Sequence, residues 1–182
     1  KQTSIYLGPK YSNEKIKNSI KSYNNMFNIY KIKPKNVAKL ISEKNIVTIF
    51  QGRSEAGPRA LGNRSILYDP TDPNGKDFVN KIKKREWFRP FACSVLQEKA
   101  KDWFDMSIKE SPHMMYVFKC KKKLSAGVAK DHNSRIQTVK KSDNFHYYNL
   151  IKSFYGLTKT PVLINTSLNL PGDVLVETLQ DL

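Results

Sequence analysis

The amino-acid sequence predicts an α/β fold: a single domain with an open sheet, preceded by an N-terminal arm. Short apolar or β-branched segments alternate with segments that have the apolar spacing of amphipathic helices. The length of 182 residues suits one domain with a real hydrophobic core. No apolar run approaches the roughly 18 residues of a membrane-spanning helix. Because residues 1–35 are more polar than the rest, we assign them to an arm or linker and residues 36–182 to the domain.

Helices are expected where apolar residues recur three or four positions apart. Ile16 and Ile20 mark a weak helix, whereas Pro34 suits a first helical turn because its missing N–H is harmless there. An aromatic-rich helix is expected to end at Gly156. The expected helices are 13–23, one beginning at 34, 76–85, 97–105, 144–156 and the start of one at 178–182.

Strands are expected where short apolar or β-branched runs are bounded by turn residues. The runs IVTIFQ and PVLIN are the clearest examples. Between these strands, the glycine-, proline- and polar-rich stretches are typical of turns and connections. The expected strands are 46–51, 66–68, 91–96, 114–120, 135–139, 161–165 and 174–176.

The charge of the chain indicates an anionic partner. Lys and Arg number 32 against 16 Asp and Glu, a net charge of +16, which attracts nucleic acid, acidic membrane surfaces or phosphorylated small molecules. Most lysines are scattered, as on a solvated helix face. The few arginines lie in turn-rich segments, where their rigid forks suit phosphate oxygens. The cysteines and histidines lack metal-ligand spacing, so we predict reduced thiols, a cytoplasmic location and no protein-bound metal.

Four segments place cations or polar groups beside tight backbone: GRSEAGPRALGNRS, KIKKREWFRPF, DHNSRIQTV and NTSLN. Glycines let a polyanion approach the main chain, and arginines on the same loop neutralise it. Each segment alone could instead be a basic surface loop, a basic helix end or a self-capping turn. Glu55 and Glu86 lie among the arginines and are expected to orient them. Together the segments suit phosphoryl or adenylyl transfer, in which positioning and charge neutralisation supply most of the rate.

In this order, GRSEAGPRALGNRSIL, NKIKKREWFRPFACSV, DHNSRIQTV and PVLINTSLN resemble the C-terminal domain of the O-carbamoyltransferases. This family acts in nodulation-factor, antibiotic and surface-glycan biosynthesis. The opening YLGPKYS resembles the family's segment just before that domain. The resemblance implies a YrdC-like fold, an open twisted mixed sheet with a concave cationic face. It also implies that carbamoyl phosphate and ATP, with Mg²⁺, are converted to carbamoyl-adenylate.

The resemblance further implies a partner domain in the same polypeptide. In the family, an N-terminal domain of the actin-like ATPase superfamily carries an iron-type metal and transfers the carbamoyl group to a hydroxyl. That domain is absent from this sequence, which begins without Met and is expected to be a piece of a longer protein. No membrane partner is expected.

The family's site residues can be carried over one by one. By this resemblance Arg59 and Arg135 hold carbamoyl phosphate and stabilise charge as carbamate attacks the α-phosphorus. The others hold nucleotide phosphates, with Arg64 as a second-rank candidate. The expected catalytic residues are Arg59, Lys83, Arg89 and Arg135, and the expected binding residues are these four with Arg64, Ser167 and Asn169.

Two departures from the family pattern leave alternatives open. Ala129 stands where a histidine is usual, and His132 where a glycine is usual, so the carbamoyl-phosphate pocket is expected to be altered. Ala129 therefore motivates a second interpretation, a non-catalytic scaffold domain. The net charge motivates a third, a module that binds double-stranded RNA, but charge alone speaks only to non-specific binding.

Overall fold

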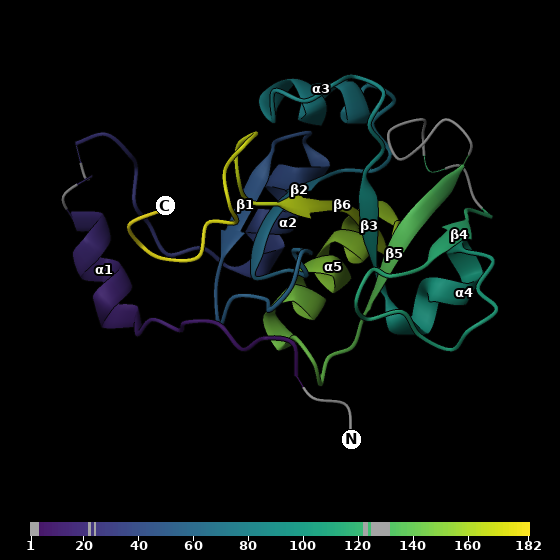
Figure 1. Ribbon diagram of the computed structural model, residues 1–182, viewed down its shortest axis with the longest axis horizontal. Coiled ribbons are helices and arrows are strands. Elements are labelled where there is room, and N and C mark those ends of the chain that lie inside the picture. Colours follow the sequence, from purple (N-terminus) through teal and green to yellow (C-terminus); the bar gives the residue numbers. More distant parts are fainter. Residues whose placement is uncertain (1–3, 22, 24, 122–123, 125–131) are drawn as a thin grey trace.

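A six-stranded open sheet organises the chain (Figure 1). The computed structural model describes residues 4–21, 23, 25–121, 124 and 132–182. In the sheet order β1-β2-β6-β3-β5-β4 all neighbours are antiparallel except β3 and β5, which are parallel. The open mixed α/β sheet predicted from the sequence is therefore confirmed. The strands are β1 (Val47–Phe50), β2 (Arg64–Tyr68), β3 (Ala92–Leu96), β4 (Val117–Lys119), β5 (Asn133–Val139) and β6 (Val162–Ser167).

Consecutive residues of the central strands point to opposite faces of the sheet and are apolar. Helices therefore cover both faces. Leu163 of β6 packs with α2 and α5, whereas the next residue, Ile164, packs in a second core with α3 and α4. None of the described helices has the length and apolar character needed to cross a membrane. The helices are α1 (Asn13–Lys21), α2 (Pro34–Ser42), α3 (Gly75–Ile82), the 3₁₀ turn η1 (Gln97–Lys99), α4 (Ala100–Trp103) and α5 (Phe145–Thr158).

The chain departs from the sequence predictions mainly near its C-terminal end. Helix α5 continues past Gly156 to Thr158, because Lys159 takes the left-handed conformation (φ 61°) that was expected of the glycine. The strand predicted at 174–176 and the helix predicted from 178 are wrong. Instead the Asp181 carboxylate accepts hydrogen bonds from two backbone N–H groups, those of residues 177 and 178, and stabilises a turn.

The segment before the sheet is tied to the loop between β1 and β2. The carbonyl of Ile5 accepts the backbone N–H of Ala56 at 2.7 Å, and the Gly8 N–H donates to the carbonyl of Ser54 at 3.1 Å. The hydroxyl of Tyr6 donates to the carbonyl of Leu61 at 3.0 Å. We name residues 5–8 the bracing segment, because they support the loop that carries Arg59.

Candidate functional site

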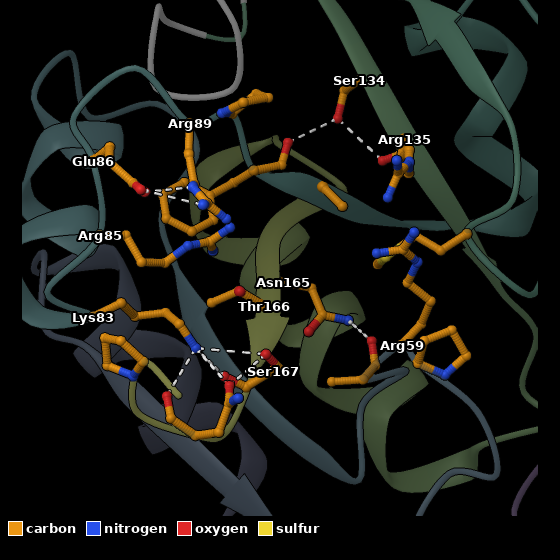
Figure 2. Close-up of a pocket in the computed structure, with 18 of the residues that line it drawn as sticks. Arg59, Lys83, Arg85, Glu86, Arg89, Ser134, Arg135, Asn165, Thr166 and Ser167 are labelled. Carbon is orange, nitrogen blue, oxygen red and sulfur yellow. Dashed lines mark hydrogen bonds and ion pairs between the residues drawn. The ribbon is translucent and has the colours of Figure 1, made fainter. Parts of the chain in front are cut away.

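A cavity of about 1000 Å³ opens at one end of the sheet, where β6 ends and β3 and β5 begin (Figure 2). Its walls come from residues 58–60, 83–86, 88–92, 133–135, 165–167 and 169–172, with Met114 and Val117. These segments are far apart in the sequence, and the sheet topology brings them together at the same end of the sheet. The predicted site residues that line this cavity are Arg59, Lys83, Arg89, Arg135, Ser167 and Asn169.

The cavity is strongly cationic. Among its described lining residues, six are Lys or Arg and only Glu86 is acidic. Because clustered cations repel one another, such a wall is stabilised by a polyanionic ligand. The six cations are Arg59, Lys83, Lys84, Arg85, Arg89 and Arg135.

Lys83 is the most enclosed of these cations, at 3 % exposure, and follows the last turn of α3. Its ammonium donates to the carbonyl of Ser167 at 2.6 Å and to both the carbonyl and Oδ1 of Asn169 at 2.9 Å. The Ser167 hydroxyl donates to the same Oδ1 at 2.6 Å. Burial, and then the positive charge of Arg85, lower the pKa of Lys83 to about 8. Lys83 thus fixes the end of β6 to α3 and joins three predicted residues into one unit.

Arg59 and Arg135 form a second unit on another part of the wall. Burial lowers the pKa of Arg59, and the positive charge of Arg135 adds to this effect. Among the described residues no carboxylate forms a salt bridge with either arginine. Two neighbouring guanidinium groups that no described carboxylate neutralises are suited to bind a small dianion.

Arg89 is held by a carboxylate, as the sequence predicted. Its Nε lies 2.5 Å from Oε2 of Glu86, and its Nη2 donates to Oε1 of Glu86 at 3.3 Å. The backbone hydrogen bond of Glu86, and then Arg89, lowers the pKa of this carboxyl. Glu86 therefore aligns a guanidinium that is about half exposed at the cavity.

Glu55 forms hydrogen bonds with backbone N–H groups rather than with an arginine side chain. Its Oε1 accepts the N–H groups of Leu61 and Asn63, each at 2.7 Å, and that of Arg64 at 3.3 Å. One carboxylate oxygen thus gathers three amide groups and closes the loop that presents Arg59. The expectation that Glu55 orients a guanidinium is corrected accordingly.

Arg64 does not lie among the lining residues of the cavity, contrary to the expectation from the sequence. It begins β2 and is fully buried. Its Nη1 donates to the carbonyls of Gln51 and Asn63 at 2.7 and 3.0 Å. Its guanidinium also lies 3.7 Å from the centre of the Phe50 ring. These contacts give Arg64 a structural role beneath the loop.

Sequence reasoning missed several lining residues. Arg85 lies over the Phe91 ring at 5.6 Å, and its pKa is lowered by burial and then by Arg89. Arg85 lies two residues after Lys83 in the segment KIKKREWFRPF, and this proximity could have identified it as a lining residue. Phe88 is another lining residue that was missed, and it is 63 % exposed at the cavity wall.

The two departures from the family pattern have different outcomes. Ala129 lies outside the described residues. His132 is exposed just before β5 and has a positive φ of 58°, a conformation that glycine adopts without strain. In the part of the chain that the structure describes, His, Cys, Asp and Glu residues do not gather in groups of three that could hold a metal ion.

The open mixed sheet occurs in a known class of domain. Solved HypF structures share this fold. The chain matches full-length HypF in a "phosphate- and nucleotide-bound form" with a TM-score of 0.60, and HypF of T. kodakarensis with 0.58. Both are 20 % identical to this chain, cover 85 and 83 % of it, and are covered by it over only 20 and 19 % of their own length.

The chain belongs to the family described as Carbamoyltransferase C-terminus, whose model matches residues 38–182. It is 42 % identical to nodulation protein NolNO of Sinorhizobium fredii and 40 % identical to nodulation protein NolO of Bradyrhizobium diazoefficiens. These matches cover 79 and 75 % of this chain but 22 and 26 % of the relatives. It is also 40 % identical to protein MJ1058 of Methanocaldococcus jannaschii, over 97 % of this chain and 30 % of that protein. The chain thus spans about a third or less of these relatives.

Proposed function

We propose that this domain forms carbamoyl-adenylate from carbamoyl phosphate and ATP. The observation that carries the proposal is the convergence of six cations from three distant segments on one cavity of about 1000 Å³. Membership of the carbamoyltransferase family supports the carbamoyl donor. The nucleotide-bound form of full-length HypF, a protein with the same fold, supports the second substrate.

The two cationic units of the cavity suit the two substrates. Carbamoyl phosphate, a small dianion, would bind Arg59 and Arg135, which have no carboxylate partner among the described residues. The triphosphate of ATP, with its Mg²⁺, would bind Arg89 and the unit of Lys83, Ser167 and Asn169. Positioning and charge neutralisation supply most of the rate in such reactions.

The proposed reaction balances in two steps. Water cleaves carbamoyl phosphate to carbamate and inorganic phosphate. A carbamate oxygen then attacks the α-phosphorus of ATP, the bond to the β-phosphate oxygen breaks, and pyrophosphate leaves. The adenylating domain would pass its product to a hydroxyl acceptor through other parts of a longer polypeptide, since the relatives are about three or more times as long as their matched region.

Pyrophosphate exchange tests the proposal directly. The chain is incubated with ATP, Mg²⁺, carbamoyl phosphate and labelled pyrophosphate, and label in ATP is measured. We expect exchange that requires carbamoyl phosphate. ATP binding without such exchange would favour a non-catalytic scaffold. Binding only to double-stranded RNA, lost between roughly 50 and 200 mM salt, would be polyelectrolyte attraction.

We expect the exchange activity to fall as pH rises through about 8, where Lys83 loses its proton. The neutral amine contributes no charge and one donor fewer to the unit that would hold the triphosphate. The free energy of unfolding is expected to change in the opposite direction. Because the unfolded chain keeps this proton up to the ordinary pKa of lysine, stability rises with pH above about 8.

The variant Lys83→Arg stays charged at these pH values, so its activity should fall only at higher pH. Lys81→Arg is the matched control, because Lys81 is exposed on the same helix and does not line the cavity. Activity and urea denaturation are measured from pH 6 to 10, a range of ~2 pH units either side of 8. A decline that stays near pH 8 in Lys83→Arg would contradict the assignment.

A further inference from the structure

Two buried atoms on the cavity wall have opposite hydrogen-bonding character and no partner among the described residues. They are the acceptor Oδ1 of Asn165 and the donor Nε of Arg59. Asn165 is only 2 % exposed. Buried polar atoms are nearly always hydrogen-bonded in folded proteins, so unpaired atoms in a cavity wall point to a ligand.

The orientation of the Asn165 amide is set by its neighbours. Its Nδ2 lies 3.1 Å from the carbonyl of Ala60, 2.9 Å from Oγ of Ser94 and 3.2 Å from Oε1 of Gln137. A carbonyl oxygen and an amide oxygen can only accept. Turning the amide over would place its oxygen against these acceptors, so the nitrogen must face them.

Gln137 cannot turn over either. Its Nε2 donates to the carbonyl of Leu61 at 2.9 Å, and its Oε1 accepts from the Ser94 hydroxyl at 2.7 Å. The network is consistent only if the oxygen of Asn165 is the acceptor left over. In Figure 2 the nitrogen of Asn165 faces the side where Arg59 lies, and its oxygen faces the other way, toward the side of Lys83 and Ser167.

An unpaired acceptor is unusual in a wall of donors. The arginines and lysines around it offer N–H groups and suit anionic oxygens. Asn165 Oδ1 suits a ligand group that itself carries N–H. A neutral amide group carries such an N–H.

We propose that Asn165 is the residue that selects a carbamoyl group over other acyl groups in this cavity. Its Oδ1 accepts an N–H of the carbamoyl amide. This inference rests on the proposed function and names the side chain that recognises the substrate. Acetyl phosphate carries a methyl group in place of the NH₂. Its binding would leave Oδ1 of Asn165 buried and unpaired, which disfavours the analogue.

The test compares carbamoyl phosphate with acetyl phosphate in ATP–pyrophosphate exchange, since acetate released from the latter could be adenylated in the same way. For the wild-type chain we expect kcat/KM to favour carbamoyl phosphate by about 100-fold or more. Asn165→Leu, of similar size but without the acceptor, should lower that ratio by about 10-fold or more. The change should fall on the KM for carbamoyl phosphate and leave the KM for ATP close to wild type.

Ser94→Ala is the matched control. It removes two hydrogen bonds of the same buried network, to Asn165 and to Gln137, but leaves the oxygen of Asn165 in place. We expect lower stability but a ratio within about threefold of wild type, since only structural contacts are lost. If Asn165 were merely structural, both variants would lose stability and neither would change the ratio.

The outcomes separate this inference from the proposed function. No exchange with either donor would overturn the proposed function and the inference with it. Equal exchange with both donors in the wild type, or an undiminished preference in Asn165→Leu, would overturn the inference alone. Should Asn165→Leu fail to fold, Asn165→Ser, which also removes the amide oxygen, and the wild-type comparison decide the question.

Discussion

Replacing Arg59 with alanine is expected to lower carbamoyl-phosphate-dependent pyrophosphate exchange by about 100- to 1000-fold, the range seen when a charge-stabilising donor is removed. The guanidinium is partly enclosed, lies close to Arg135, and has no carboxylate partner in the described part of the chain. The charge and the N–H donors of this guanidinium are therefore available to a bound anion. Arg59→Lys should recover only part of the activity, because a lysine offers a charge without the planar fork.

Arg53→Ala is the matched control for Arg59→Ala. Arg53 belongs to the same loop, but it is exposed, lies outside the cavity and donates to the carbonyl of Gly8 at 3.0 Å. Its loss should leave exchange within about threefold of wild type, as expected for a surface substitution. Steady-state kinetics of both variants decide the matter. Equal losses would mean that the loop, rather than the guanidinium of Arg59, matters.

Replacing Arg64 with methionine is expected to destabilise the fold by about 3 kcal/mol or more, since charged hydrogen bonds contribute about 1.5–3 kcal/mol each. The substitution leaves the carbonyls of Gln51 and Asn63 without their buried donor and removes the cation from the Phe50 ring. Methionine fills much of the same volume, so the lost polar contacts dominate over any cavity. Urea denaturation measures the change.

Arg53→Met provides the comparison, because it removes an exposed arginine and should change stability by less than about 1 kcal/mol. A small effect of Arg64→Met, similar to that of Arg53→Met, would show that the buried guanidinium contributes little. If Arg64 instead served ligand binding, the variant would keep its stability and lose only activity.

The sheet could be predicted from the sequence because its strands are short apolar runs between turn residues. The run PVLIN becomes most of β6, whose residues pack on both faces. The strand predicted at 174–176 did not form: the Val176 N–H donates to the carbonyl of Leu168, but these three residues belong to no ladder of the described sheet. Val174 is 84 % exposed.

The cavity was predictable in its cations but not in its internal contacts. Arg59 and Arg64 belong to one glycine-rich segment of the sequence and look alike there, yet Arg59 lines the cavity and Arg64 begins β2, buried under the loop. Only the position of Phe50 and of the carbonyls around Arg64 separates them. Likewise, the role proposed for Asn165 depends on Ser94 and Gln137, which come from other strands.

The bracing segment affects where a minimal version of this domain should begin. A fragment limited to residues 38–182, the stretch matched by the family model, would retain every strand and every cavity residue. It would nevertheless lack Tyr6 and its neighbours, leaving the backbone groups of Ser54 and Ala56 and the Leu61 carbonyl without those partners. We therefore expect the autonomous folding unit to be longer than the region matched by the family model, with its first residue ahead of Ile5.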